Sequence, residues 1–91
     1  PGEKKIMANA YCRESGIALE AETDCYGVQF YAGNFIGEQT GKGGAAYHDR
    51  SAFCLESQFY PNAVNEPDFP SPVVKAGHTY HTETSYRFYL R

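Results

Sequence analysis

One carboxylate in the sequence lies where a general base would need to be. Glu56 is in the middle of an apolar-polar alternation, next to Leu55 and on the same face as Cys54. A strand holds such a group rigidly, and a carboxylate that points into a cleft can take a proton from a substrate. The same pattern also fits an exposed glutamate on a solvated strand. Spacing alone leaves both interpretations open.

The histidines do not form a comparable site. His78 and His81 would point to opposite faces of a strand, so they cannot both bind one metal ion without a bulge. Glu83 shares a face with His81, but two ligands do not make a metal site. His48 lies among turn residues, and neither a second carboxylate opposite Glu56 nor a Ser-His-Asp arrangement can be assembled. We therefore predict no metal ligands.

The elements that must position Glu56 are predicted to be short strands. The period-two alternation of apolar residues is typical of β-strands, and no segment shows a helical period. The predicted strands are 6–13, 17–22, 28–31, 51–58 and 78–90. Residues 37–44 contain four glycines and are predicted to form a flexible loop, and residues 60–72 hold four of the five prolines and are predicted to form a long one. The pattern predicts an all-β sandwich or barrel.

Composition limits the possible classes of protein. The 91 residues allow at most one domain, and a formal net charge of −3 has the wrong sign for a nucleic-acid-binding surface. No apolar run approaches the roughly 18–20 residues that a membrane helix requires. The three cysteines are an odd number, and no charged-then-apolar signal segment opens the chain, which fits a reducing compartment, so we expect a cytoplasmic protein.

Several segments resemble the aldose 1-epimerase (galactose mutarotase) family. Residues 27–35, GVQFYAGNF, resemble its G-V-Q-F-Y-T-G-N-F segment, and residues 53–58, FCLESQ, resemble F-C-L-E-[ST]-Q. Residues 61–70 are similar to the P-D-A-x-N…F-P loop, and residues 76–88 to the closing P-G-E-x-Y…Y-x-F strand. Residues 15–20 resemble S-G-R-x-L-E, with Ile in place of Arg. Five segments in the right order are more specific than any one of them.

The resemblance implies a reaction and roles for particular residues. Glu56 would be the general base that takes the proton from the anomeric hydroxyl of the sugar, and Gln29 would contact the sugar. Tyr31 shares a strand face with Gln29 and is a second predicted substrate contact. The implied reaction interconverts the α and β anomers of a free aldohexose such as galactose or glucose. It consists of proton transfers and requires no metal or organic cofactor.

The resemblance also implies that residues 1–91 are the C-terminal part of a larger antiparallel β-sandwich, of the galactose mutarotase-like supersandwich type. Residues 1–14 would be a loose start or an edge strand. The family's acid histidine has no counterpart in these residues, so we expect the segment alone to be inactive. Its exposed strand edges would be covered by the remainder of the enzyme or by a second copy, with no nucleic-acid or membrane partner.

The sequence also fits two alternative functions. One is a non-catalytic carbohydrate-binding or structural module that keeps the same fold. The other is an epimerase of phosphorylated hexoses, which would need cations directed at the phosphate, and Lys42 and Arg50 are the available candidates.

Overall fold

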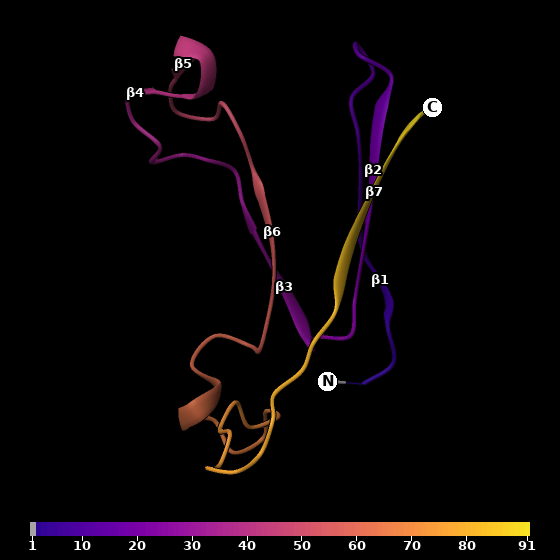
Figure 1. Cartoon of the computed structure of the whole chain (residues 1–91), viewed down its shortest axis with the longest axis vertical. Coiled ribbons are helices and arrows are strands. Elements are labelled where there is room, and N and C mark those ends of the chain that lie inside the picture. Colours follow the sequence, from indigo (N-terminus) through magenta and orange to yellow (C-terminus); the bar gives the residue numbers. More distant parts are fainter. Residues whose placement is uncertain (1) are drawn as a thin grey trace.

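The computed structural model describes residues 2–91 and consists mainly of antiparallel strands (Figure 1). The strands are β1 (Lys5–Tyr11), β2 (Ile17–Thr23), β3 (Gly27–Tyr31), β4 (Gln39–Thr40), β5 (Ala46–Tyr47), β6 (Cys54–Gln58) and β7 (Thr84–Leu90). Two single-turn 3-10 helices, η1 (Lys42–Gly44) and η2 (Ala63–Asn65), lie between them. In the described residues, no helix is long and apolar enough to cross a membrane. The predicted all-β, antiparallel class is confirmed.

The larger sheet has three strands in the order β1-β2-β7. β2 is central and pairs along its whole length with β7, from Ile17 opposite Leu90 to Thr23 opposite Thr84. β1 forms one edge and ends at Tyr11, earlier than the sequence pattern predicts, because a tight turn follows it. In this turn the Gly16 N–H donates to the Cys12 carbonyl at 2.9 Å.

The second sheet consists of β3 and β6, which carry the candidate site. Five consecutive pairs join the two strands, from Gly27 opposite Gln58 to Tyr31 opposite Cys54. The strand predicted over 51–58 begins only at Cys54, because the ladder with β3 ends at the pair of Tyr31 and Cys54. The sequence pattern therefore located both strands, and their pairing fixed where β6 starts.

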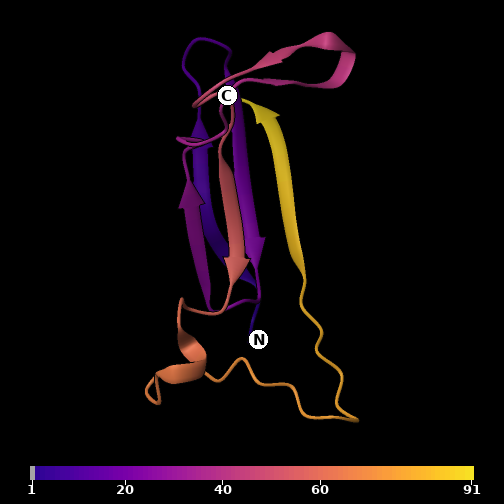
Figure 2. The ribbon, with the colours of Figure 1, turned by 90° about the vertical axis from the view of Figure 1, so that its left-hand side faces the viewer.

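The two sheets form two layers that lie close together at one end and diverge at the other (Figure 1). In the view of Figure 2, β3 and β6 lie in front of β1 and β2. Near the close end, hydroxyl groups on β7 contact β6. An apolar cleft of about 560 Å³ separates the layers further along, lined by residues that include Leu19, Phe53, Leu55 and Phe88. The radius of gyration is 16.5 Å, larger than the roughly 12 Å of a compact domain of this length.

The described residues bury little apolar surface. The buried hydrophobic side chains are small: Ala18, Ala21, Cys25 and Ala63. Large apolar side chains lie at the surface instead, with Phe35 88% exposed, Leu90 81% and Phe88 68%. Soluble domains rarely expose a contiguous apolar surface of this kind, and such surfaces are typical of sites of interaction.

Two sequence predictions about the irregular segments are wrong. The strand predicted over 78–90 begins at Thr84, because its partner β2 ends at Thr23 and leaves residues 78–83 outside the sheet. The glycine-rich residues predicted to form a flexible loop include β4 and η1, and β4 pairs with β5 in a small hairpin. Gly43 and Gly44 have φ values of 67° and 82°, which let the chain turn back between the two strands.

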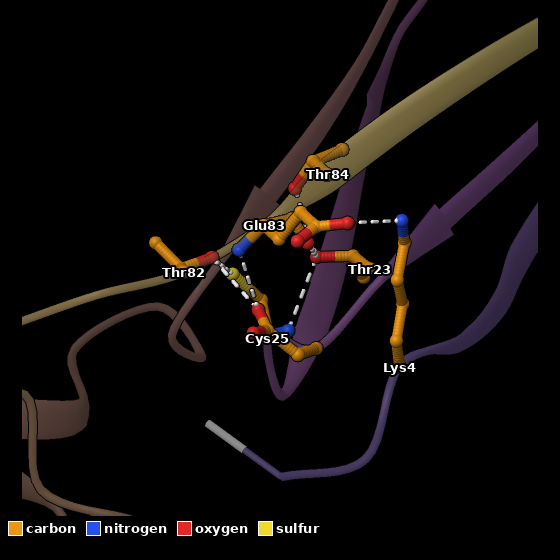
Figure 3. Close-up of polar contacts among 7 residues, drawn as sticks. Lys4, Thr23, Cys25, Thr82, Glu83 and Thr84 are labelled. Atoms are coloured by element: carbon orange, nitrogen blue, oxygen red, sulfur yellow. Dashed lines mark hydrogen bonds and ion pairs between the residues drawn. The ribbon is translucent and has the colours of Figure 1, made fainter.

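A cluster of polar contacts fastens the end of β2 to the start of β7 (Figure 3). The Asp24 carboxylate accepts hydrogen bonds from the Glu83 N–H at 3.0 Å and the Thr82 hydroxyl at 2.9 Å. The Asp24 N–H donates back to the Glu83 carbonyl at 3.2 Å. Lys4 forms an ion pair with the Glu83 carboxylate at 2.6 Å, so residues before β1 join the same cluster.

These contacts make the cluster sensitive to acid. The hydrogen bond from the Glu83 N–H lowers the pKa of Asp24, and the hydrogen bond from Lys4 lowers the pKa of Glu83. A carboxylate whose pKa is depressed by folding stabilises the protein above its unfolded pKa, and this contribution is lost as the pH falls through its folded pKa.

We expect Asp24→Asn to weaken this pH dependence, because the amide keeps an acceptor oxygen but does not titrate. The measurement is the free energy of unfolding in urea between about pH 5 and about pH 2, using the complete polypeptide that contains these residues. The variant should lose less stability over this range than the wild type. Asp68→Asn, an exposed position in a loop, is the control and should follow the wild-type curve. Equal slopes for Asp24→Asn and the wild type would contradict the prediction.

Candidate active site

The structure brings two of the predicted site residues together. Gln29 on β3 and Glu56 on β6 are direct partners in the register of the two-stranded sheet. Residues opposite each other in an antiparallel pair have Cβ atoms about 4.5–5.5 Å apart and point to the same face. Both side chains are exposed. An amide and a carboxylate thus lie side by side on one open face.

This face points away from the larger sheet. The neighbour of Glu56, Ser57, directs its hydroxyl at Thr84 of β7, at 2.8 Å. Successive side chains on a strand alternate between faces, so Glu56 and its partner Gln29 lie on the opposite side. The larger sheet supports the pair from behind and leaves it accessible to a ligand.

The pair has the chemistry needed to bind and deprotonate a polyol. The glutamine amide offers donors and an acceptor to hydroxyl groups, and an ionised carboxylate accepts hydrogen bonds and protons only. A hydroxyl bound between Gln29 and Glu56 can be held by the amide while the carboxylate takes its proton.

Tyr31, the third predicted site residue, lies on the same face but has a structural contact. It lies two residues after Gln29 on β3 and pairs with Cys54, which lies two residues before Glu56 on β6. Its hydroxyl accepts a hydrogen bond from the Phe35 N–H at 3.1 Å. This bond fixes the chain that leaves β3, so Tyr31 borders the pair with its hydroxyl already engaged by the backbone.

An aromatic side chain with no role predicted from the sequence borders the other end of the pair. Tyr60 lies against Gly27, where an added Cβ would approach the ring atoms to 2.9 Å. The ring makes an edge-to-face contact with Phe69 at 5.2 Å between centroids. Gly27 is on the same strand face as Gln29, so the ring stands beside the site. A glycine within a strand often marks such a close approach, and this was the available signal.

The other polar residues considered from the sequence lie elsewhere. The described residues include no group of three or more His, Cys, Asp or Glu side chains that could hold a metal. Glu83 pairs with Lys4 instead of joining a histidine. Arg50 donates to the Asn34 side chain at 3.3 Å, and Lys42 is in η1 of the small hairpin. These residues are not directed at the Gln29–Glu56 pair by any contact in the structure.

Comparison with known proteins identifies the family. Residues 2–87 match the family model described as aldose 1-epimerase, and the chain belongs to that family. It is 46% identical over 87 residues to galactose mutarotase of Bos taurus and 45% identical to that of Homo sapiens, in each case over 94% of this chain and 25% of the relative. It is 33% identical to aldose 1-epimerase of Escherichia coli K12, over 93% of this chain and 25% of the relative. The chain therefore spans about a quarter of the length of these relatives.

Proposed function

We propose that this chain supplies the base and part of the sugar site of an isomerase that interconverts the α and β anomers of free aldohexoses such as galactose and glucose. The observation that carries the proposal is the direct pairing of Gln29 with Glu56 across β3 and β6. Membership of the aldose 1-epimerase family supports it. Glu56 is the proposed base, Gln29 holds the sugar, and Tyr31 is a flanking contact.

In the proposed reaction, two proton transfers open the sugar ring and the reverse two close it. Glu56 takes the proton from the anomeric hydroxyl, the C1–O1 bond becomes a carbonyl, and the C1–O5 bond of the ring breaks. The ring oxygen takes a proton from an acid. Rotation about C1–C2 presents the other face of the aldehyde, and the reverse steps close the ring as the other anomer. During closure Glu56 returns its proton to O1 and the acid regains its proton from O5, so the reaction has no net proton transfer.

We further propose that the acid and the covering surfaces come from additional residues of a mutarotase-like sandwich. The relatives are about four times as long as the matched region, since this chain covers 25% of them. The apolar side chains that line the cleft, such as Phe53 and Phe88, and the exposed Leu90 at the end of β7 supply a surface for those residues. Residues 1–91 alone should therefore lack activity and associate in solution. A compact, active monomer of these residues alone would contradict this proposal, and a well-defined dimer would favour a second copy as the cover.

We also propose a cytoplasmic location. Cys12 and Cys54 are exposed free thiols and Cys25 is a buried one, which suits a reducing compartment. Fractionation of cells that express the natural gene tests this proposal, and recovery in an oxidising compartment would contradict it.

The activity is tested by polarimetry on freshly dissolved α-galactose and α-glucose. The complete polypeptide that contains these residues should accelerate the change in optical rotation well above the buffer rate. The same assay on the 6-phosphates distinguishes the enzyme from an epimerase of phosphorylated hexoses, which would prefer the phosphates. Sugar binding without acceleration would contradict the proposal and favour a non-catalytic module.

A further inference from the structure

Two hydroxyl groups of β7 hold the residues on both sides of Glu56. The Tyr86 hydroxyl donates to the Leu55 carbonyl at 3.0 Å. The Thr84 hydroxyl lies 2.8 Å from the Ser57 hydroxyl. Thr84 and Tyr86 are two residues apart and therefore share one face of their strand, the face directed at β6. β7 thus contacts β6 at the positions immediately before and after the proposed base.

The Thr84 contact is anchored further into the larger sheet. Thr84 is the register partner of Thr23, and their hydroxyl groups lie 2.9 Å apart (Figure 3). Thr23 is only 2% exposed, and its hydroxyl also accepts the Cys25 N–H at 3.1 Å. A continuous series of hydroxyl contacts therefore runs from a buried position on β2, through Thr84, to Ser57 beside the base.

These contacts matter because β6 has limited support from backbone pairing. Within residues 2–91, its ladder partner is β3, and the two strands form a sheet of their own. Backbone pairing therefore fixes Glu56 relative to Gln29 but not relative to the larger sheet. The hydroxyl contacts from Thr84 and Tyr86 are the polar bonds that join β6 to the larger sheet.

We propose that Thr84 and Tyr86 are positioning residues that fix the Glu56 carboxylate for proton transfer. This inference rests on the proposed function. Thr84 sets the position of Ser57, and Tyr86 sets that of the Leu55 carbonyl. Neither side chain touches the sugar, since both lie on the far side of the β3–β6 sheet. Their loss should therefore slow the chemical step and leave sugar binding close to normal.

The size of the effect follows from the geometry of proton transfer. A displacement of about 1 Å at a reacting group can cost about 10²-fold in rate. Thr84→Val removes only one of the two hydroxyl contacts, so Glu56 should move by less than about 1 Å. We therefore expect this variant to lower kcat about tenfold. An interaction that acts mainly in the transition state lowers kcat and kcat/KM together. KM should therefore stay within about twofold of the wild-type value.

The experiment compares four variants of the complete polypeptide by polarimetry and thermal melting. Thr84→Val removes the hydroxyl, Thr84→Ser keeps it and should restore most of kcat, and Tyr86→Phe removes one oxygen atom from the second restraint. Thr79→Val changes the same atoms at an exposed position outside the strands and is the control. The inference is supported if Thr84→Val and Tyr86→Phe lower kcat with KM unchanged and Thr84→Ser recovers it.

Other outcomes separate this inference from the proposed function. An inactive wild-type polypeptide overturns the proposed function itself. An active wild type with a Thr84→Val variant of equal kcat overturns only the positioning role. If Thr84→Val does not fold, Tyr86→Phe decides, and a normal kcat in that variant is evidence against the restraint. A loss of kcat that matches the unfolded fraction and that Thr84→Ser does not reverse would show a purely structural role.

Discussion

Glu56→Gln is expected to lower the rate of galactose mutarotation by about 10²- to 10⁴-fold, the usual contribution of a general base. The amide has nearly the same shape as the carboxylate and can still accept a hydrogen bond from the sugar, but it cannot take the proton at neutral pH. The loss should therefore fall on kcat, with sugar binding retained. Polarimetry with α-galactose and the complete polypeptide measures the rate, and titration with galactose measures binding.

The control for this variant is Glu14→Gln, which makes the same chemical change at an exposed position in the turn between β1 and β2. It should keep the wild-type rate. A Glu56→Gln variant that is folded, binds galactose and keeps the wild-type rate would show that Glu56 is not the base.

Gly33→Ala is expected to destabilise the protein by about 3 kcal/mol or more. Gly33 is buried just after β3, with a φ of 76° that disfavours any residue with a Cβ. A Cβ at this position would overlap the carbonyl oxygen of Ala52 and lie 2.8 Å from the Ile36 side chain. The Gly33 carbonyl also accepts the Arg50 N–H at 2.8 Å, so the substitution disturbs the point where the chains leaving β3 and entering β6 meet.

Gly37→Ala separates the two causes of this loss. Gly37 has a similar φ of 70°, but no atom lies within 4 Å of the position that a Cβ would occupy. Its substitution should therefore cost only the conformational penalty, about 1–2 kcal/mol. Urea unfolding of the complete polypeptide gives both values. Equal losses for the two variants would show that the close approach at Gly33 has no effect.

The sequence predicted the strands well wherever the pattern is local. The alternation over 17–22 and 28–31 predicts β2 and β3, because successive side chains of a strand point to opposite faces and give a period of two within the strand itself. The alternation of apolar and polar residues does not determine where the backbone pairing of two strands ends. β6 and β7 start later than predicted because their partners end, which depends on contacts far along the chain. The hairpin of β4 and β5 was missed because its strands have two residues each and no alternation to detect.

The candidate site was only partly predictable. The position of Glu56 in a strand pattern made it a candidate base, and the resemblance to a family supplied a role for it and for Gln29. Their direct pairing depends on the register between β3 and β6, which local pattern does not determine. The hydroxyl contacts of Thr84 and Tyr86 had no sequence signal, because they depend on how two sheets pack.

We propose that Gln29 and Glu56 act together on one sugar, and a double-mutant cycle tests this joint role. Mutarotation rates are measured for the wild type, Gln29→Ala, Glu56→Gln and the double variant of the complete polypeptide. Gln29→Ala should lower the rate about tenfold in the wild type, the value of one lost hydrogen bond to the sugar. In the Glu56→Gln background it should lower the rate less than about threefold, because there is no base left for the sugar to be aligned with. The same tenfold loss in both backgrounds would show that the two residues act independently and would contradict their joint role.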